Sequence, residues 1–255
     1  MNTVRRIWRT VVPDPVRRAV RRALPGLRSR QSATGSRRSG ASPRPGPGAP
    51  GGLNRLHVGC GPHNLMAEWW NVDIRKFPGV DQAADVTEPW PWRNLDYVYG
   101  EHFLEHLSLD GAIQFLTHAA DALRDGGRIR LSTPGLEWVW HTHFQPSASA
   151  PAADVIAATY KANRAFYGWG HQFLFSRPML EHVLRGAGLG DLTFHVFGES
   201  EDAVLRGLEQ HGGFEVVDGW PNVWIVEATP TRSGSAATVL AEADSELERY
   251  RRAGH

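Results

Sequence analysis

The chain has 255 residues, and its net charge of +1 conceals two segments of opposite charge. Residues 1–52 contain 12 arginines and one acid, giving +11, while residues 53–255 contain 16 basic and 26 acidic side chains, giving −10. A hydrophobic content of 41% allows the acidic segment to bury a core, and about 200 residues usually form one domain. The single cysteine excludes an intrachain disulfide framework, and no run reaches the roughly 18 uncharged apolar residues of a membrane span.

The basic segment divides into an arm and a linker. In residues 1–28, apolar side chains recur at helical spacing with arginines between them, which predicts two short basic amphipathic helices. Three roles are open for this arm: a membrane-surface anchor, a nucleic-acid arm or an organellar transit peptide. The interleaved valine and leucine favour an anionic membrane surface, so we expect a cytoplasmic protein, peripheral at the inner membrane surface. The acidic body argues against nucleic acid as a partner. Residues 29–52 are rich in Ser, Gly, Pro and Arg, which predicts a disordered linker.

From Leu53 onward, short apolar runs alternate with helical patterns. The predicted strands are 53–58, 70–74, 80–86, 95–99, 128–132, 192–197 and 223–228, and the predicted helices are 109–123, 177–185 and 200–210. This alternation predicts an α/β domain over 53–230, with a mostly parallel sheet and helices on both faces. Residues 136–175 form a long insertion rich in aromatic and histidine residues, which predicts a lid. The tail, residues 231–255, predicts a surface helix.

A glycine turn directly follows the first predicted strand. Gly59 and Gly61 allow backbone N–H groups to approach a polar or anionic ligand closely. Asp73 ends the second strand, where a carboxylate can accept hydrogen bonds from both hydroxyls of a ribose, and Asp85 ends the third, placed to meet an adenine edge. Each of these residues alone also fits a plain turn or a capping acid, but the ordered set favours a nucleoside ligand at the carboxyl edge of the sheet. A dinucleotide fingerprint is disfavoured, because it requires glycine where Asn64 stands.

Five stretches together resemble class I S-adenosylmethionine-dependent methyltransferases of the type 11 branch. They are Leu56–Gly61, Asn71–Ile74, Ala84–Val86, His102–Leu107 and Leu123–Leu131, with a weaker likeness at Trp169–Phe173. The resemblance implies a Rossmann-like, seven-stranded, mostly parallel sheet and S-adenosyl-L-methionine as cofactor. It also implies methyl transfer to an oxygen, less favourably a nitrogen, of a small molecule or glycan. The cofactor-binding residues that it implies are His57 (where the family often has an acid), Gly59, Cys60, Gly61, Asp73, Ile74, Asp85, Val86 and Gly100.

Histidines supply the candidate catalytic residues, because methylation of a hydroxyl requires a base. We assign His102, His106 and His171, with His102 and His171 favoured, although a single histidine is more often structural. The spacing of His102, Glu105 and His106 places all three on one helix face, a geometry that can hold a divalent metal. The plainer interpretation is an ordinary helix start, so we assign no metal ligand.

Two other functions compete with methyl transfer. The first is a non-catalytic, methyltransferase-like binding or scaffold protein at a membrane surface. The second is a nicotinamide-dependent dehydrogenase, which the missing third glycine disfavours. The sequence does not indicate an oligomeric state.

Overall fold

The computed structural model describes residues 46–47, 54–211 and 213–253. The predicted arm, residues 1–28, and nearly all of the predicted linker lie outside the described residues. The strands are β1 (Arg55–Val58), β2 (Trp70–Asp73), β3 (Gln82–Ala83), β4 (Leu95–Glu101), β5 (Leu123–Pro134), β6 (Leu189–His195), β7 (Val216–Val217), β8 (Trp220–Pro221) and β9 (Val223–Pro230). The helices are the 3₁₀ turn η1 (Leu104–His106), α3 (Leu109–Ala122), α4 (Leu136–His143), α5 (Ala152–Tyr167), α6 (Arg177–Gly186) and α7 (Ala236–Ala253).

Seven strands form one sheet in the order β3-β2-β1-β4-β5-β9-β6. Strands β1 to β5 pair in parallel, and β9 runs antiparallel to both of its neighbours, β5 and β6. The chain moves outward from β1 to β3 and then returns to β4 on the other side of β1. This reversal creates a switch point between β1 and β4, where sheets of this kind bind ligands. The seven-stranded, mostly parallel sheet confirms the predicted Rossmann-like architecture.

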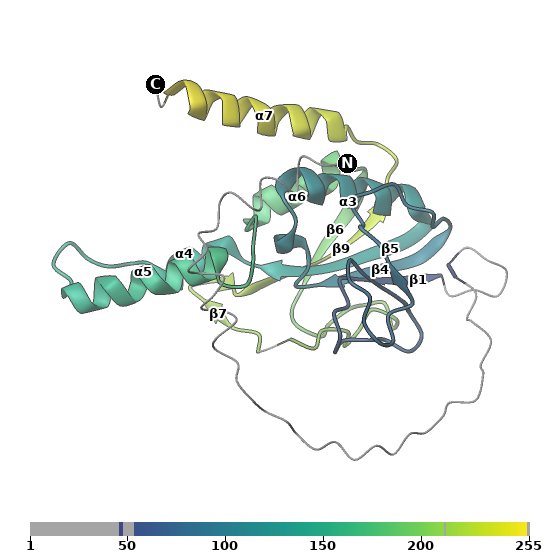
Figure 1. Cartoon of the computed structure of the whole chain (residues 1–255), viewed down its shortest axis with the longest axis horizontal. Coiled ribbons are helices and arrows are strands. Elements are labelled where there is room, and N and C mark those ends of the chain that lie inside the picture. Colours follow the sequence, from purple (N-terminus) through teal and green to yellow (C-terminus); the bar gives the residue numbers. More distant parts are fainter. Residues whose placement is uncertain (1–45, 48–53, 212, 254–255) are drawn as a thin grey trace, which may run out of the picture. The chain divides into compact units, whose positions relative to one another are not determined.

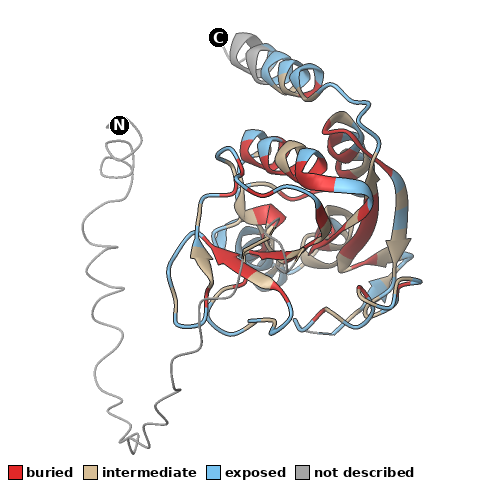
Figure 2. Cartoon of the chain, turned by 90° about the vertical axis from the view of Figure 1, so that its right-hand side faces the viewer, coloured by how far each residue is buried: buried red, intermediate tan, exposed pale blue. Residues whose placement is uncertain are grey.

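One face of the sheet is covered by helices α3 and α6 (Figure 1). Helix α3 begins at Ser108, whose hydroxyl accepts a hydrogen bond from the backbone N–H of Gly111. Its apolar side chains, including Ile113 and Phe115, are fully buried against the strands. Helix α6 contributes Leu180 and others to the same core. Buried residues run along the strands and along the sides of the helices that face them (Figure 2).

The opposite face is covered by segments without helix. Residues 59–69 and 198–211 supply Trp69 and Leu205, which pack against Tyr99 of β4. The predicted helix at 200–210 is therefore wrong. Asp202 accepts a hydrogen bond from the N–H of Val204 through its side chain, and Gly207 has a positive φ of 71°, so the chain forms a turn that cannot continue as a helix. The sequence predicts helices on both faces of the sheet. In the described residues, α3 and α6 cover one face and non-helical segments cover the other.

Three helices, α4, α5 and α7, remain to be placed. Helices α4 and α5 lie within the predicted insertion at 136–175. Helix α7 lies within residues 231–255, where the sequence predicts a tail helix, and its Val239 packs in the core. No helix among the described residues combines the length and apolar character that crossing a bilayer requires.

Candidate active site

The glycine turn after β1 has a backbone that only glycine adopts easily. Gly59 and Gly61 have φ angles of +64° and +56°. A Cβ on Gly59 would lie 2.4 Å from the ring of Phe103, so a side chain there would collide with its neighbour. The N–H of Gly61 donates to Oδ2 of Asp73 at 2.9 Å, which ties the turn to the end of β2. The turn at the switch point of the sheet is therefore held in place by Asp73 and packed closely against Phe103.

Two carboxylates stand beside the turn. Asp73 is only 8% exposed, and its Oδ1 accepts a hydrogen bond from the N–H of Arg75 at 2.9 Å. Asp85 is exposed, and its Oδ1 accepts hydrogen bonds from the N–H and the hydroxyl of Thr87. Each carboxylate oxygen has two lone pairs, so these contacts leave both groups able to accept further hydrogen bonds.

A cavity of about 430 Å³ opens above the turn. It brings together six of the residues that the sequence assigns to cofactor binding and two of the three assigned catalytic histidines. Its lining residues are Gly59, Gly61, Asp73, Ile74, Arg75, Asp85, Val86, His102, Phe103, His106, Leu107 and Trp169.

Three other residues assigned to cofactor binding lie in the protein interior behind the turn. His57 is buried and its Nδ1 lies 3.2 Å from Oδ1 of Asn71; burial lowers the pKa of His57 to about 4, so the ring is neutral at pH 7. Burial, followed by the charge of Asp73, raises the pKa of the Cys60 thiol to about 12. A Cβ on Gly100 would meet Val58 at 3.1 Å. These residues support the turn from behind and do not line the cavity.

A second cavity of about 470 Å³ adjoins the first. The two share three residues, His102, His106 and Trp169, so they form neighbouring chambers around the same side chains. The second chamber also contains the third assigned histidine. Its lining residues are His102, Glu105, His106, Pro134, Trp169, His171 and His211.

His102 occupies a strained position at the end of β4. Its φ is +45°, uncommon for a residue with a Cβ, and it precedes the 3₁₀ turn rather than lying on a helix face as predicted. Its Nδ1 lies 3.1 Å from Oε1 of Glu105, a fully buried carboxylate whose Oε2 accepts a hydrogen bond from the hydroxyl of Thr133. Burial alone would lower the pKa of His102, but the hydrogen bond and charge of Glu105, with the charge of Glu101, raise it above its ordinary value. This pairing leaves Nε2 of His102 as the free nitrogen.

The structure adds a histidine that the sequence did not reveal. His211 faces His102, with ring centroids 5.6 Å apart, and its Nδ1 lies 3.1 Å from Oε2 of Glu101. Oε1 of Glu101 accepts the backbone N–H groups of Gln210 and His211 at 2.8 and 2.9 Å. Glu101 and His211 are 110 residues apart in sequence, so no local spacing of residues predicts their contact.

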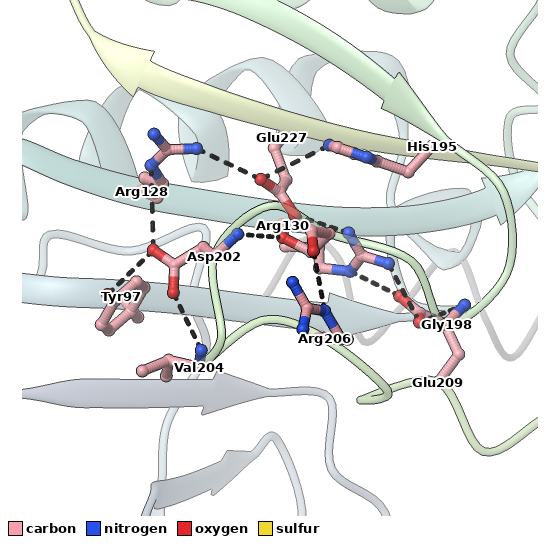
Figure 3. A network of polar contacts seen from close by, with 11 residues as sticks. Tyr97, Arg128, Arg130, His195, Gly198, Asp202, Val204, Arg206, Glu209 and Glu227 are labelled. Atoms are coloured by element: carbon pink, nitrogen blue, oxygen red, sulfur yellow. Dashed lines mark hydrogen bonds and ion pairs between the residues drawn. The ribbon is translucent and has the colours of Figure 1, made fainter.

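A buried ion network holds the segment that carries His211 (Figure 3). Arg130 of β5 is fully buried, and its guanidinium contacts Glu209 through two hydrogen bonds of 2.7 and 3.1 Å. It also donates to Glu227 of β9 at 2.6 Å. Although burial would lower the pKa of Arg130, the two carboxylates raise it, so the guanidinium stays charged. Because Glu209 precedes His211 by two residues, this network fixes the approach of His211 to the second chamber.

The insertion at 136–175 places His171 in the wall of the second chamber. The backbone N–H groups of Gln172 and Phe173 donate to the carbonyl of Glu105 at 2.7 and 3.3 Å. His171 thereby lies against His106, with ring centroids 5.1 Å apart. Two other histidines of the insertion, His141 and His143, line neither chamber.

Comparison with known proteins adds only remote similarity. No protein-family model matches the chain, and no curated protein matches it. A SAM-dependent methyltransferase structure from Archaeoglobus fulgidus is 16% identical, with a TM-score of 0.43, over 68% of this chain and 84% of that one. The mitomycin 7-O-methyltransferase MmcR is 16% identical, with a TM-score of 0.41, over 69% of this chain and 48% of that one. The S-adenosylmethionine-dependent methyltransferase SibL is 20% identical, with a TM-score of 0.35, over 58% of this chain and 35% of that one. The chain thus spans less than half the length of the last two, and similarity this remote carries no information on the reaction.

Proposed function

We propose that the chain is an S-adenosylmethionine-dependent methyltransferase that methylates a hydroxyl group of a small molecule or glycan. The observation that carries this proposal is the pair of adjoining chambers at the switch point. One is built from a glycine turn and strand-end carboxylates, and the other from histidines, a buried glutamate and an exposed tryptophan. The first suits a nucleoside, and the second suits a polar acceptor that must lose a proton.

The first chamber fits the cofactor in size and in chemistry. Its volume of about 430 Å³ falls within the roughly 300–1,000 Å³ of small-molecule sites. Gly59 and Gly61 would contact the methionine part, Asp73 would accept hydrogen bonds from the ribose hydroxyls, and Asp85 with Val86 would border the adenine. When bound, S-adenosylmethionine supplies an electrophilic methyl group on a sulfonium.

The second chamber would orient the acceptor and accept its proton. Nδ1 of His102 is engaged by Glu105, so Nε2 is available to take the proton of an acceptor hydroxyl, and the raised pKa of His102 strengthens it as a base. Trp169 is 62% exposed and lines both chambers, where its ring can stack on a sugar or an aromatic acceptor and exclude water. His106 and His171 complete the wall.

Calorimetry of the purified chain with S-adenosylmethionine and S-adenosylhomocysteine tests the cofactor site. We expect Asp73→Ala to weaken binding about 100-fold, because it removes charge-assisted hydrogen bonds of about 1.5–3 kcal/mol. Asp125→Ala, which removes an exposed carboxylate far along the chain, should leave the affinity unchanged. No binding to wild-type protein at high micromolar concentrations would contradict the proposal and favour the binding or scaffold alternative.

A second experiment tests the base. We expect His102→Gln to bind S-adenosylmethionine like wild type while losing most turnover, measured as S-adenosylhomocysteine release with a panel of hydroxylated acceptors. Unchanged turnover would show that His102 is not the base. The dehydrogenase alternative gains no support from the fold, since no helix follows the glycine turn between β1 and β2, a stretch that the structure describes throughout.

A further inference from the structure

Three side chains of the second chamber offer metal-ligating atoms at short mutual distances. One ligand atom each from Glu105, His106 and His171 lies within 4.8 Å of the other two. We propose that these residues form a binding site for a divalent first-row transition metal ion. The role that we give this ion rests on the proposed methyl transfer, whereas the site itself does not.

His171 is held in the tautomer that a metal ligand requires. Its Nδ1 lies 2.7 Å from the backbone carbonyl of Ala165, which can only accept a hydrogen bond, so Nδ1 carries the proton. In the neutral ring, Nε2 then carries the lone pair that a metal ion requires. A histidine that donates its second nitrogen to a carbonyl is the usual arrangement around protein-bound metals.

Of the other two ligands, Glu105 is held by its neighbours and His106 has ring nitrogens available for coordination. Glu105 is fully buried, and its carboxylate is oriented by Thr133 on one oxygen and His102 on the other. No hydrogen bond to another described residue engages the ring nitrogens of His106, although the ring lies against His171. One of three ligands is therefore a buried carboxylate fixed by its neighbours, and another is an imidazole whose nitrogens have no described protein partner.

The backbone locks the two ligand-bearing segments together. Gln172 donates its backbone N–H to the carbonyl of Glu105, and its side-chain amide donates to the carbonyl of His106 at 2.5 Å. The second of these contacts joins residues 66 positions apart in sequence. Ligands of one metal at about 2.1 Å lie about 3–4 Å from each other, so a small closing movement of the side chains completes the site.

The donor set indicates the class of metal. Two imidazoles and one carboxylate suit Mn²⁺, Fe²⁺, Co²⁺ or Zn²⁺ better than Mg²⁺ or Ca²⁺, which prefer oxygen ligands. Three protein ligands leave coordination positions open toward the second chamber, where an acceptor with neighbouring oxygen atoms can bind. A metal-bound hydroxyl loses its proton more easily, so the ion would assist His102, the adjacent base. The favoured acceptors are consequently vicinal diols, such as sugars, or catechol-like rings.

Titration with Co²⁺ tests the site directly, because its visible spectrum reports nitrogen ligands and coordination number. We expect the metal-free full chain to bind one equivalent of Co²⁺, and Mn²⁺ to compete for the same site. His171→Asn retains a donor for the Ala165 carbonyl but lacks Nε2, and His106→Phe retains the ring contact but lacks both nitrogens. Each variant should weaken Co²⁺ binding at least tenfold and change the spectrum, whereas His182→Asn, on the exposed surface of α6, should do neither.

Two results would overturn the metal site: no stoichiometric Co²⁺, Mn²⁺ or Zn²⁺ binding at micromolar concentrations, or variants that bind Co²⁺ like wild type. Circular dichroism of His171→Asn and His106→Phe shows whether each variant is folded. Calorimetry with S-adenosylmethionine separates this proposal from the proposed function. Metal binding without cofactor binding contradicts methyl transfer and retains the metal site. Cofactor binding without metal binding contradicts the metal site and retains the proposed methyl transfer.

Discussion

The two faces of the sheet are built by different physical means. On the helical face, α3 and α6 bury aliphatic and aromatic side chains against the strands, and the core there is almost wholly apolar. On the opposite face, segments without helix cover the strands, and buried polar groups such as His57, Arg130 and Glu227 accompany a small aromatic cluster. The first face is therefore stabilised mainly by apolar burial, and the second depends on paired charges and hydrogen bonds.

This difference determines which face can shape the site. Helices α3 and α6 pack on the sheet through their apolar side chains. The loop-covered face instead uses the Arg130–Glu209 ion pair to hold residues 198–211 in place, and that segment carries His211 to the second chamber. Stability and function are consequently more closely coupled on the loop-covered face.

The largest expected effect is that of breaking the ion network. Glu209→Ala leaves Arg130 buried with one of its two partners, and removing one partner from a buried ion pair costs about 3–5 kcal/mol. We expect the free energy of unfolding, measured by urea denaturation, to fall by that amount, and turnover of the folded fraction to fall as well because His211 loses its anchor. A loss of stability with wild-type turnover would show that the network does not position His211.

A matched change on the helical face should affect stability alone. Leu116 is fully buried in α3, and Leu116→Ala should cost about 2–5 kcal/mol through lost burial and the cavity that it leaves. Below the denaturation midpoint, the folded fraction should turn over like wild type. Reduced turnover comparable to that of Glu209→Ala would remove the distinction between the two faces.

The loop-covered face should also make stability depend on pH. His57 has a pKa of about 4 in the folded protein, below the roughly 6.5 of an unfolded chain. Between these values the unfolded state binds the extra proton, so stability is full above about pH 6.5 and falls as the pH drops toward 4, by up to about 3 kcal/mol. Urea denaturation of wild type and His57→Asn at pH 7 and pH 4.5 checks this. An equal pH dependence in both proteins would contradict it.

The N-cap of α3 offers a smaller effect on the helical face. Ser108→Ala removes the hydroxyl that accepts the N–H of Gly111. The expected cost is about 1 kcal/mol, measured as a shift of the urea midpoint. Ser108→Asp, which restores a capping acceptor, should recover most of this loss, and a cost that persists in that variant would point to packing instead.

The smallest effect on the folded domain should come from removing residues 1–52. We expect an unchanged affinity for S-adenosylmethionine, because the residues of both chambers come later in the chain. Binding to anionic lipid vesicles should be lost, since the +11 charge is removed. If truncation instead abolishes cofactor binding, the basic segment contributes to the domain itself.

The sequence predicts the first chamber better than the second for a physical reason. Gly59 directly follows β1, Asp73 ends β2 and Asp85 lies two residues after β3, so the parallel sheet alone brings them to one edge. The structure groups them around one cavity. The contacts of the second chamber join residues far apart in sequence, such as Glu101 with His211, and local spacing does not encode them.

The same reason explains the wrong helix at 200–210. Its apolar spacing fits a helix, but Glu209 pairs with Arg130, 79 residues away. That pairing is compatible with the observed turn, where Gly207 adopts a positive φ. The strand predicted at 80–86 is also longer than the observed β3, in which Gln82 and Ala83 pair with β2.

The left-handed backbone of His102 is a strained position for the proposed base. A residue with a Cβ at φ +45° costs about 1 kcal/mol or more that glycine would not. Glycine at this position would relieve that strain, but it would also leave Oε1 of the buried Glu105 without the imidazole that contacts it. On the proposed function, the strain is the cost of holding an imidazole where it can take the proton of the acceptor.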